Sequence, residues 1–158
     1  MDRMARLGVM ISAQAQPYSH YDEILQNWGK GNLERAVPMR AWLDHHLMVS
    51  MGSDWMGYPN NPFINLYFYV SRKAENGMLA DASQKISREE ALRVATINNA
   101  YLTFEEDVKS SVETGKLADF LVLSQDFLTV PQEQIRAIRP LATYVGGRKV
   151  FASKDGGF

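Results

Sequence analysis

The order of the predicted elements indicates an α/β fold, in which two parallel strands alternate with helices and a smaller β-rich segment follows. The run 8–16 is apolar at its start and alternates Ala with Gln at its end, which predicts a strand that leaves the core. A second buried strand is predicted at 47–51. Helical patterns lie between and after these strands, so we expect parallel strands joined by right-handed crossovers.

The first helix is predicted at 37–46, with Pro38 in its first turn, because proline is well tolerated there. The stretch 17–23, Pro-Tyr-Ser-His-Tyr-Asp-Glu, precedes it and is predicted to be a loop. After the second strand, another helix is predicted to begin with Asn61 as its cap and Pro62 in its first turn, and apolar residues follow with helical spacing.

The second half of the chain begins helical and ends in strands. Ser87 and Glu90 form a capping box, which predicts the start of another helical segment. A turn and a short apolar strand are predicted at 115–126, a helical turn at 130–138 and a β-hairpin around Gly146-Gly147. These elements predict a small β-rich appendage.

Composition narrows the class of protein. The chain has 158 residues, 46% of them hydrophobic and 22% charged, which is typical of one globular domain. A net charge of −1 gives no indication of nucleic-acid or anionic-membrane partners. There is no cysteine, and no apolar run approaches the ~20 residues that span a bilayer. We expect a mature cytoplasmic chain.

Several motifs resemble, in the same order, the C-terminal part of the amidohydrolase superfamily. The resemblance is strongest to the branch of metal-dependent hydrolases that includes N-substituted formamide deformylase. The matching stretches are ARLGVMISAQAQP (5–17), LERAVPMRAWL (33–43), GSD (52–54), S-x-E-E-A-L-R…T-x-N-x-A (87–100), GKLADFLVL (115–123) and VGGRKVF (145–151).

The resemblance implies the last quarter of a (β/α)₈ TIM-type barrel, followed by the C-terminal strands of a small β-sandwich. A complete barrel typically takes about 250 residues. The implied seventh and eighth barrel strands are 8–14 and 47–52, the closing helices lie in 61–104, and the sandwich strands lie in 118–152. We therefore expect a barrel part over 1–112 and a sandwich part over 113–158.

Asp54 matches the family's aspartate at the end of the last barrel strand, which binds a divalent metal and takes a proton from the attacking water. Its sequence context alone also fits a helix cap or a turn residue. The family's other ligands are histidines on or after earlier strands and a bridging Lys or Glu, and this chain has no match for them. Because a catalytic metal usually needs about three protein ligands, we expect zinc in the full-length parent and none bound by this chain alone.

Residues that follow the predicted seventh strand are predicted to contact substrate. Gln16 and His20 follow the predicted seventh strand on the catalytic side of a barrel, and Gln14 and Tyr18 are weaker candidates of the same kind. The alternative for His20 is an ordinary loop histidine.

Trp55 follows Asp54 and is predicted, with Met56 and Tyr58, to form the wall of a substrate pocket. The alternative for these three residues is core packing against the next helix.

Other polar residues are predicted to have structural roles. His45 and His46 lie at a helix end away from the chemistry, where a positive charge is favourable. The run 105–107 is a solvated helix end. Lys116 and Asp119 fix the turn into the sandwich. Arg35 matches an arginine of the family branch, and the sequence indicates no role for it.

The sequence leaves three hypotheses. The first is the C-terminal portion of a metal-dependent amidohydrolase that cleaves the C–N bond of a small amide-type substrate by metal-activated water, inactive by itself. It would self-associate or bind the missing N-terminal part of the barrel, because unpaired strand edges promote association. The second is a non-catalytic interaction protein that stands alone. The third is one chain of a split hydrolase.

Overall fold

The computed structural model describes residues 1–54, 61–154 and 157. The helices are α1 (Asp2–Arg6), α2 (Gln16–Ser19), α3 (Tyr21–Trp28), α4 (Lys30–Arg35), α5 (Met39–Asp44), α6 (Pro62–Ser71), α7 (Arg88–Ala95) and α8 (Ile97–Leu102), with 3₁₀ helices η1 (Ala82–Gln84) and η2 (Gln132–Ala137). The strands are β1 (Met10–Ala13), β2 (Met48–Met51), β3 (Phe120–Leu123), β4 (Pro140–Val145) and β5 (Arg148–Ala152).

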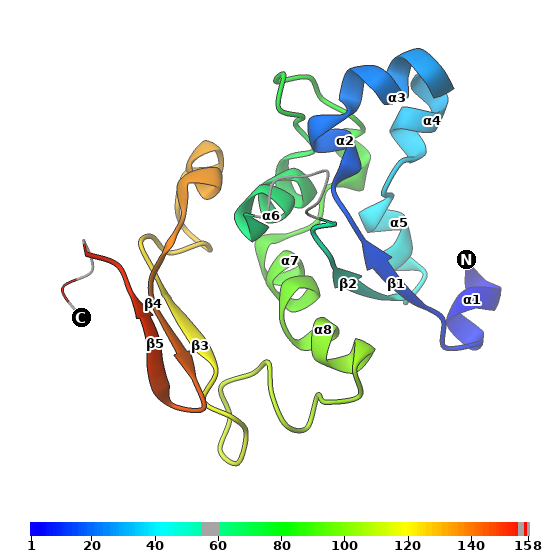
Figure 1. The fold of residues 1–158 in the computed structure, drawn as a ribbon. Coiled ribbons are helices and arrows are strands. Elements are labelled where there is room, and N and C mark those ends of the chain that lie inside the picture. Colours follow the sequence, from blue (N-terminus) through cyan, green and yellow to red (C-terminus); the bar gives the residue numbers. More distant parts are fainter. Residues whose placement is uncertain (55–60, 155–156, 158) are drawn as a thin grey trace.

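The two predicted parallel strands are confirmed. β1 and β2 pair side by side, with Met10 opposite Met48 and Ala13 opposite Met51, and helices α2 to α5 form the connection between them (Figure 1). Parallel pairing in register brings the carboxyl ends of both strands to the same edge of the sheet. That edge is where α/β proteins place their functional loops.

Side chains from α8 satisfy the outer edge of β2. The amide of Gly52 donates to Ala13 O, so the backbone groups of residues 50 and 52 face β1 and those of 49 and 51 face away. Asn98 Nδ2 donates to Val49 O at 2.7 Å, and Met51 N donates to Asn99 Oδ1 at 2.9 Å. The outer edge of β1 differs, because no hydrogen bond among the described residues reaches the outward-facing amides of Met10 and Ser12.

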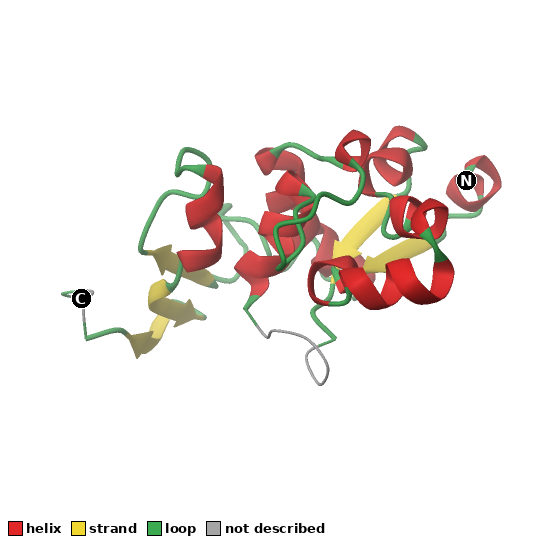
Figure 2. Cartoon of the chain, turned by 90° about the horizontal axis from the view of Figure 1, so that it is seen from above, coloured by secondary structure: helices red, strands yellow, loops and turns green. Residues whose placement is uncertain are grey.

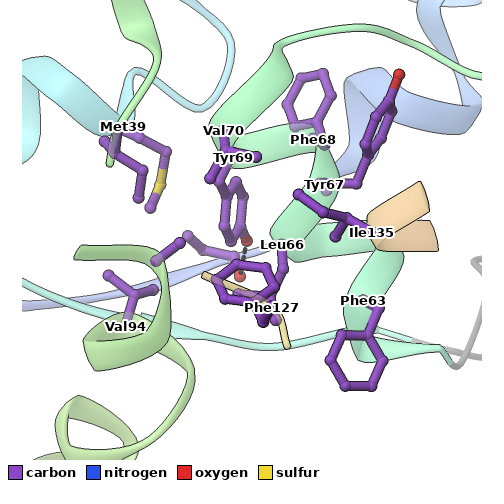
Figure 3. Packing of buried hydrophobic residues seen from close by; sticks show 14 of the residues in the cluster. Met39, Phe63, Leu66, Tyr67, Phe68, Tyr69, Val70, Val94, Phe127 and Ile135 are labelled. Carbon is purple, nitrogen blue, oxygen red and sulfur yellow. Dashed lines mark hydrogen bonds between the residues drawn. The ribbon is translucent and has the colours of Figure 1, made fainter. Parts of the chain in front are cut away.

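Helix α6 forms the centre of the core. Asn61 caps it by accepting from Phe63 N, as predicted, and eight of its ten residues are buried. Its side chains meet Val94 of α7, Met39 of α5 and the C-terminal residues Phe127 and Ile135 (Figure 3). Within this core the Tyr69 hydroxyl donates to Ala13 O at 3.0 Å, so the helix is tied to the end of β1 (Figure 3).

The second sheet has the order β3-β4-β5 and is antiparallel, with the predicted hairpin between β4 and β5. It lies to one side of the parallel sheet (Figure 2), and the segment that joins β3 to β4 packs against α6. The residues of that segment in the core are Phe127, Val130, Ile135 and Ile138. Large apolar side chains of the sheet, including Leu121 and Val150, remain about half exposed. Among the described residues, the strands form these two small sheets and no closed barrel.

The sequence prediction for the segment 17–23 is wrong. The segment 17–23 was expected to be a loop, but it lies in α2 and α3, and α4 follows directly. An amphipathic helix is indicated by the i, i+3, i+7 spacing of Tyr21, Ile24 and Trp28. The polar residues between them led to the prediction of a loop. The helical segment predicted to begin at Ser87 is confirmed together with its capping box, and Thr96, with φ of −122° and ψ of −95°, divides it into α7 and α8.

None of the helices in the described ranges is both long and apolar enough to cross a bilayer.

Replacing Tyr69 by Phe tests how strongly α6 holds the end of β1. Tyr69 is fully buried, so its loss leaves Ala13 O with one hydrogen bond fewer. We expect Tyr69→Phe to lower the free energy of unfolding by about 1–2 kcal/mol in urea denaturation. The control is Tyr101→Phe, whose ring is 38% exposed, and it should change the free energy by less than about 0.5 kcal/mol. Equal effects of the two substitutions would contradict this assignment.

Candidate functional site

The candidate site is built around the carboxyl edge of the parallel sheet. Gly52 continues β2 past its last residue, because its amide donates to Ala13 O at 2.8 Å. A Cβ at Gly52 would lie 3.2 Å from Gln14 Nε2 and 3.4 Å from Ser12 Oγ. The edge therefore brings polar side chains of β1 close against the backbone of β2, and a larger residue at position 52 would have to push the end of the Gln14 side chain aside.

Three polar side chains line the edge in a row. Gln16 Nε2 donates to Gln14 Oε1 at 3.3 Å, and Gln14 Nε2 donates to Ser12 Oγ at 3.3 Å. From the other side, Asn65 Nδ2 of α6 donates to Gly52 O at 2.9 Å. This row carries both donors and acceptors and no charge, which suits contact with a neutral amide.

Asp54 stands two residues beyond Gly52 and is exposed. Its φ of +49° is left-handed, a conformation that aspartate tolerates better than most residues. The cap of α6 is Asn61, so Asp54 does not cap that helix. Asp54 thus follows the end of β2 in a left-handed backbone conformation, at the same edge as Gln14. Trp55, Met56 and Tyr58 lie outside the described residues.

The residues predicted after β1 have different environments. Gln16 and His20 line one groove of about 360 Å³ between α2, α3 and the corner at Ala36 and Val37. His20 Nε2 lies 4.0 Å from the carboxylate of Glu23. Tyr18 is buried instead, with its ring edge-on to Tyr67 at 6.3 Å between centroids, so it belongs to the core.

Arg72 is the buried charge that sequence reasoning missed. Its guanidinium donates to Val37 O and Ala36 O, both at 2.9 Å, and lies over the Phe68 ring, 4.5 Å from its centroid. Burial lowers the pKa of Arg72 to about 10. The residue ends α6 with a left-handed φ of +58°. The one feature of the sequence that points to a buried Arg72 is its position directly after a helix of nearly continuous apolar residues.

His45, Lys116 and Asp119 lie where structural roles were predicted for them, whereas the run 105–107 lies beyond the end of α8 and its Glu105 and Glu106 are partly buried. His45 follows α5 and pairs with the carboxylate of Asp2, before β2 begins. Asp119 Oδ1 accepts from Gly146 N at 2.6 Å, which ties the turn before β3 to the hairpin. Lys116 Nζ donates to Glu106 O at 2.6 Å. Arg35 donates to Asn32 within α4 and is exposed.

The residues of the described ranges do not by themselves fit a metal site. Among them there is no group of three or more His, Cys, Asp or Glu side chains close enough to hold an ion. Asp54 offers one carboxylate, while His20 and His45 are engaged with other carboxylates. A catalytic metal usually has about three protein ligands, so the described part of the chain by itself lacks the required donor set.

Comparison with known proteins decides the family, because a model of the amidohydrolase family matches residues 1–151. The chain belongs to the amidohydrolase family. It is 31% identical over 147 residues to the N-substituted formamide deformylase of Arthrobacter pascens, covering 92% of this chain and 27% of that protein. It is also 23% identical over 155 residues to the putative amidohydrolase YtcJ of Bacillus subtilis.

Solved structures share the fold of this chain over part of their length. An uncharacterized metal-dependent hydrolase from Pyrococcus horikoshii superposes with a TM-score of 0.71 at 19% identity, over 84% of this chain and 27% of that one. Another from Pyrococcus furiosus gives a TM-score of 0.62 at 26% identity, over 81% and 26%. This amidohydrolase chain therefore spans about a quarter of the length of the relatives it matches.

The Arg72 contact predicts a measurable loss of stability. Arg72→Met removes both charge-assisted hydrogen bonds while the aliphatic stem is largely kept, so we expect the free energy of unfolding to fall by about 1.5–3 kcal/mol in urea. Arg93 of α7 is exposed, and Arg93→Met is the control, with an expected change below about 0.5 kcal/mol. An Arg72→Met protein as stable as the control would show that the contact is dispensable.

Proposed function

We propose that this chain forms the closing quarter of a metal-dependent amidohydrolase that hydrolyses the C–N bond of a small amide-type substrate. In this assignment β1 and β2 are the last two strands of a (β/α)₈ barrel, and β3 to β5 belong to its β-sandwich. The observation that carries the proposal is the position of Asp54, a carboxylate directly after the second of two parallel strands. Similarity to N-substituted formamide deformylase supports the C–N bond as the target.

The role proposed for Asp54 is proton transfer. Water attacks the carbonyl carbon of the substrate, and the carboxylate of Asp54 accepts the proton that the water loses. When the C–N bond breaks, the protonated Asp54 returns that proton to the leaving nitrogen, which departs as an amine. The neutral amides of Gln14 and Gln16 are placed to hydrogen-bond the substrate on the β1 side of the same edge.

The open edge of β1 supports pairing with a further strand. The outward amides of Met10 and Ser12 meet no partner among the described residues, and a closed barrel leaves no such edge. We propose that the rest of the barrel pairs there and brings the histidine ligands, either from the same polypeptide or from a separate chain. Self-association of this chain through the same edge is the alternative.

A second candidate function is a non-catalytic interaction protein. The observation that favours it is the outer edge of β2, which Asn98 and Asn99 of α8 already occupy. In a closed barrel every strand has two neighbouring strands, so α8 must release this edge before the barrel closes. A chain that keeps α8 in place is a stable module with one open edge rather than part of an enzyme.

A chimera separates the two functions. The matched segment of the Arthrobacter pascens deformylase is replaced by residues 1–151 of this chain, and zinc content and formamide hydrolysis are measured. We expect the chimera to bind zinc and to hydrolyse the formamide. Asp54→Asn in the chimera should lower kcat about 10²–10⁴-fold, because a positioned general base contributes that much.

The matched control is Asp107→Asn, which removes an exposed carboxylate of the 105–107 run and should leave kcat unchanged. This chain by itself should neither bind zinc stoichiometrically nor hydrolyse the substrate. Tight zinc binding by the chain alone, or an Asp54→Asn chimera with full activity, would contradict the proposed function.

A further inference from the structure

We propose that the groove between α2, α3 and the Ala36–Val37 corner binds the nitrogen substituent of the substrate, and that it selects an uncharged aromatic ring. This inference rests on the proposed function, because it takes the carboxyl edge of the sheet as the place of reaction.

The groove is connected to the candidate site by side-chain contacts. Gln16 lines the groove and donates to Gln14, and Gln14 lies against Gly52, two residues before Asp54. A substrate whose amide group lies along Gln14 and Gln16 therefore has its substituent directed into the groove. Figure 1 shows α2 following the end of β1, with α3 and α4 beyond it.

The lining of the groove is mostly apolar. Pro17, Ile24, Ala36 and Val37 contribute to it, together with Trp28, whose side chain lies at the end of α3. Trp28 is 66% exposed, although it is the largest apolar side chain of that helix. A volume of about 360 Å³ falls at the lower end of the range for small-molecule sites, so the groove suits one ring rather than a long chain.

The charge of the lining selects against anions. Glu23 and His20 are its ionisable residues, and no Lys or Arg side chain is among the described residues that line it. A negatively charged substituent would therefore meet the carboxylate of Glu23 without a compensating cation. A neutral ring stacks on the indole of Trp28 without this cost.

The back wall of the groove is held in place by a buried cation. Arg72 donates to the carbonyls of Ala36 and Val37, and both residues line the groove. Val37 has a left-handed φ of +52°, which is unfavourable for a β-branched residue and indicates that its surroundings fix it. The wall is thus a constrained part of the fold and keeps its shape without ligand.

The test measures binding directly on the full chain, without catalysis. NMR titrations compare N-(2-phenylethyl)acetamide, its aliphatic counterpart N-propylacetamide and a version of the aromatic amide with a carboxylate on the ring. We expect the neutral aromatic amide to bind about tenfold more tightly than either of the others, and ring stacking contributes on this scale. Chemical-shift changes should map to Gln16, His20 and Trp28.

Substitutions identify the residues responsible. Trp28→Ala should lower affinity for the aromatic amide about tenfold, and Trp28→Phe should restore most of it. Glu23→Gln should reduce the penalty for the carboxylate version and leave the neutral amide unaffected. Leu25→Ala is the control, because Leu25 is on the same helix and 38% exposed but does not line the groove.

Equal affinity for the aromatic and aliphatic amides, or unchanged binding by Trp28→Ala, would overturn the inference. Either result leaves the proposed function intact, because the effect of Asp54→Asn on turnover in the chimera does not depend on the groove. Conversely, full activity of the Asp54→Asn chimera would contradict the proposed function. If the aromatic amide still bound at Trp28, the groove would remain a binding site.

Discussion

The parallel pairing of β1 with β2 is the constraint on which the rest of the structure depends. Two parallel strands by themselves bury little surface and leave backbone groups unpaired, so other elements must hold them. Helix α6 does so through Tyr69 and Asn65, and α8 does so through its two asparagines. The shared register then fixes where Gln14 and Gly52 meet, and with them the place of Asp54.

The two edges of this sheet differ in a way that bears on function. The outer edge of β2 is satisfied from within the chain, while that of β1 is open among the described residues. Unpaired strand edges invite pairing with another strand. Under the proposed function, a further strand pairs with the open edge of β1, and the barrel closes only when α8 leaves the outer edge of β2. The half-exposed apolar side chains of β3 to β5 indicate a second surface that suits a covering element.

Elements with a strong local signal were predicted correctly from sequence. The capping box at Ser87, the cap at Asn61 and the Gly146-Gly147 turn each depend on a few neighbouring residues. The strand–helix–strand order also predicted correctly that β1 and β2 are parallel. The features that the sequence did not predict depend on contacts between residues far apart in the chain, such as Arg72 with Ala36 and Asn98 with Val49. Such contacts depend on how the helices pack against the rest of the fold, which local sequence patterns do not specify. The groove was not predicted either. Its walls include α2 and α3, and the segment 17–23 within them was predicted to be a loop.

Amide hydrogen exchange on the chain in dilute solution tests the central claim, that one edge of the parallel sheet is closed and the other is open. We expect the amide of Met51, which donates to Asn99, to be strongly protected, and the amide of Ser12 on the outer edge of β1 to exchange rapidly. Protection of Ser12 equal to that of its neighbours Ile11 and Ala13 in the dilute chain, or rapid exchange at Met51, would contradict it.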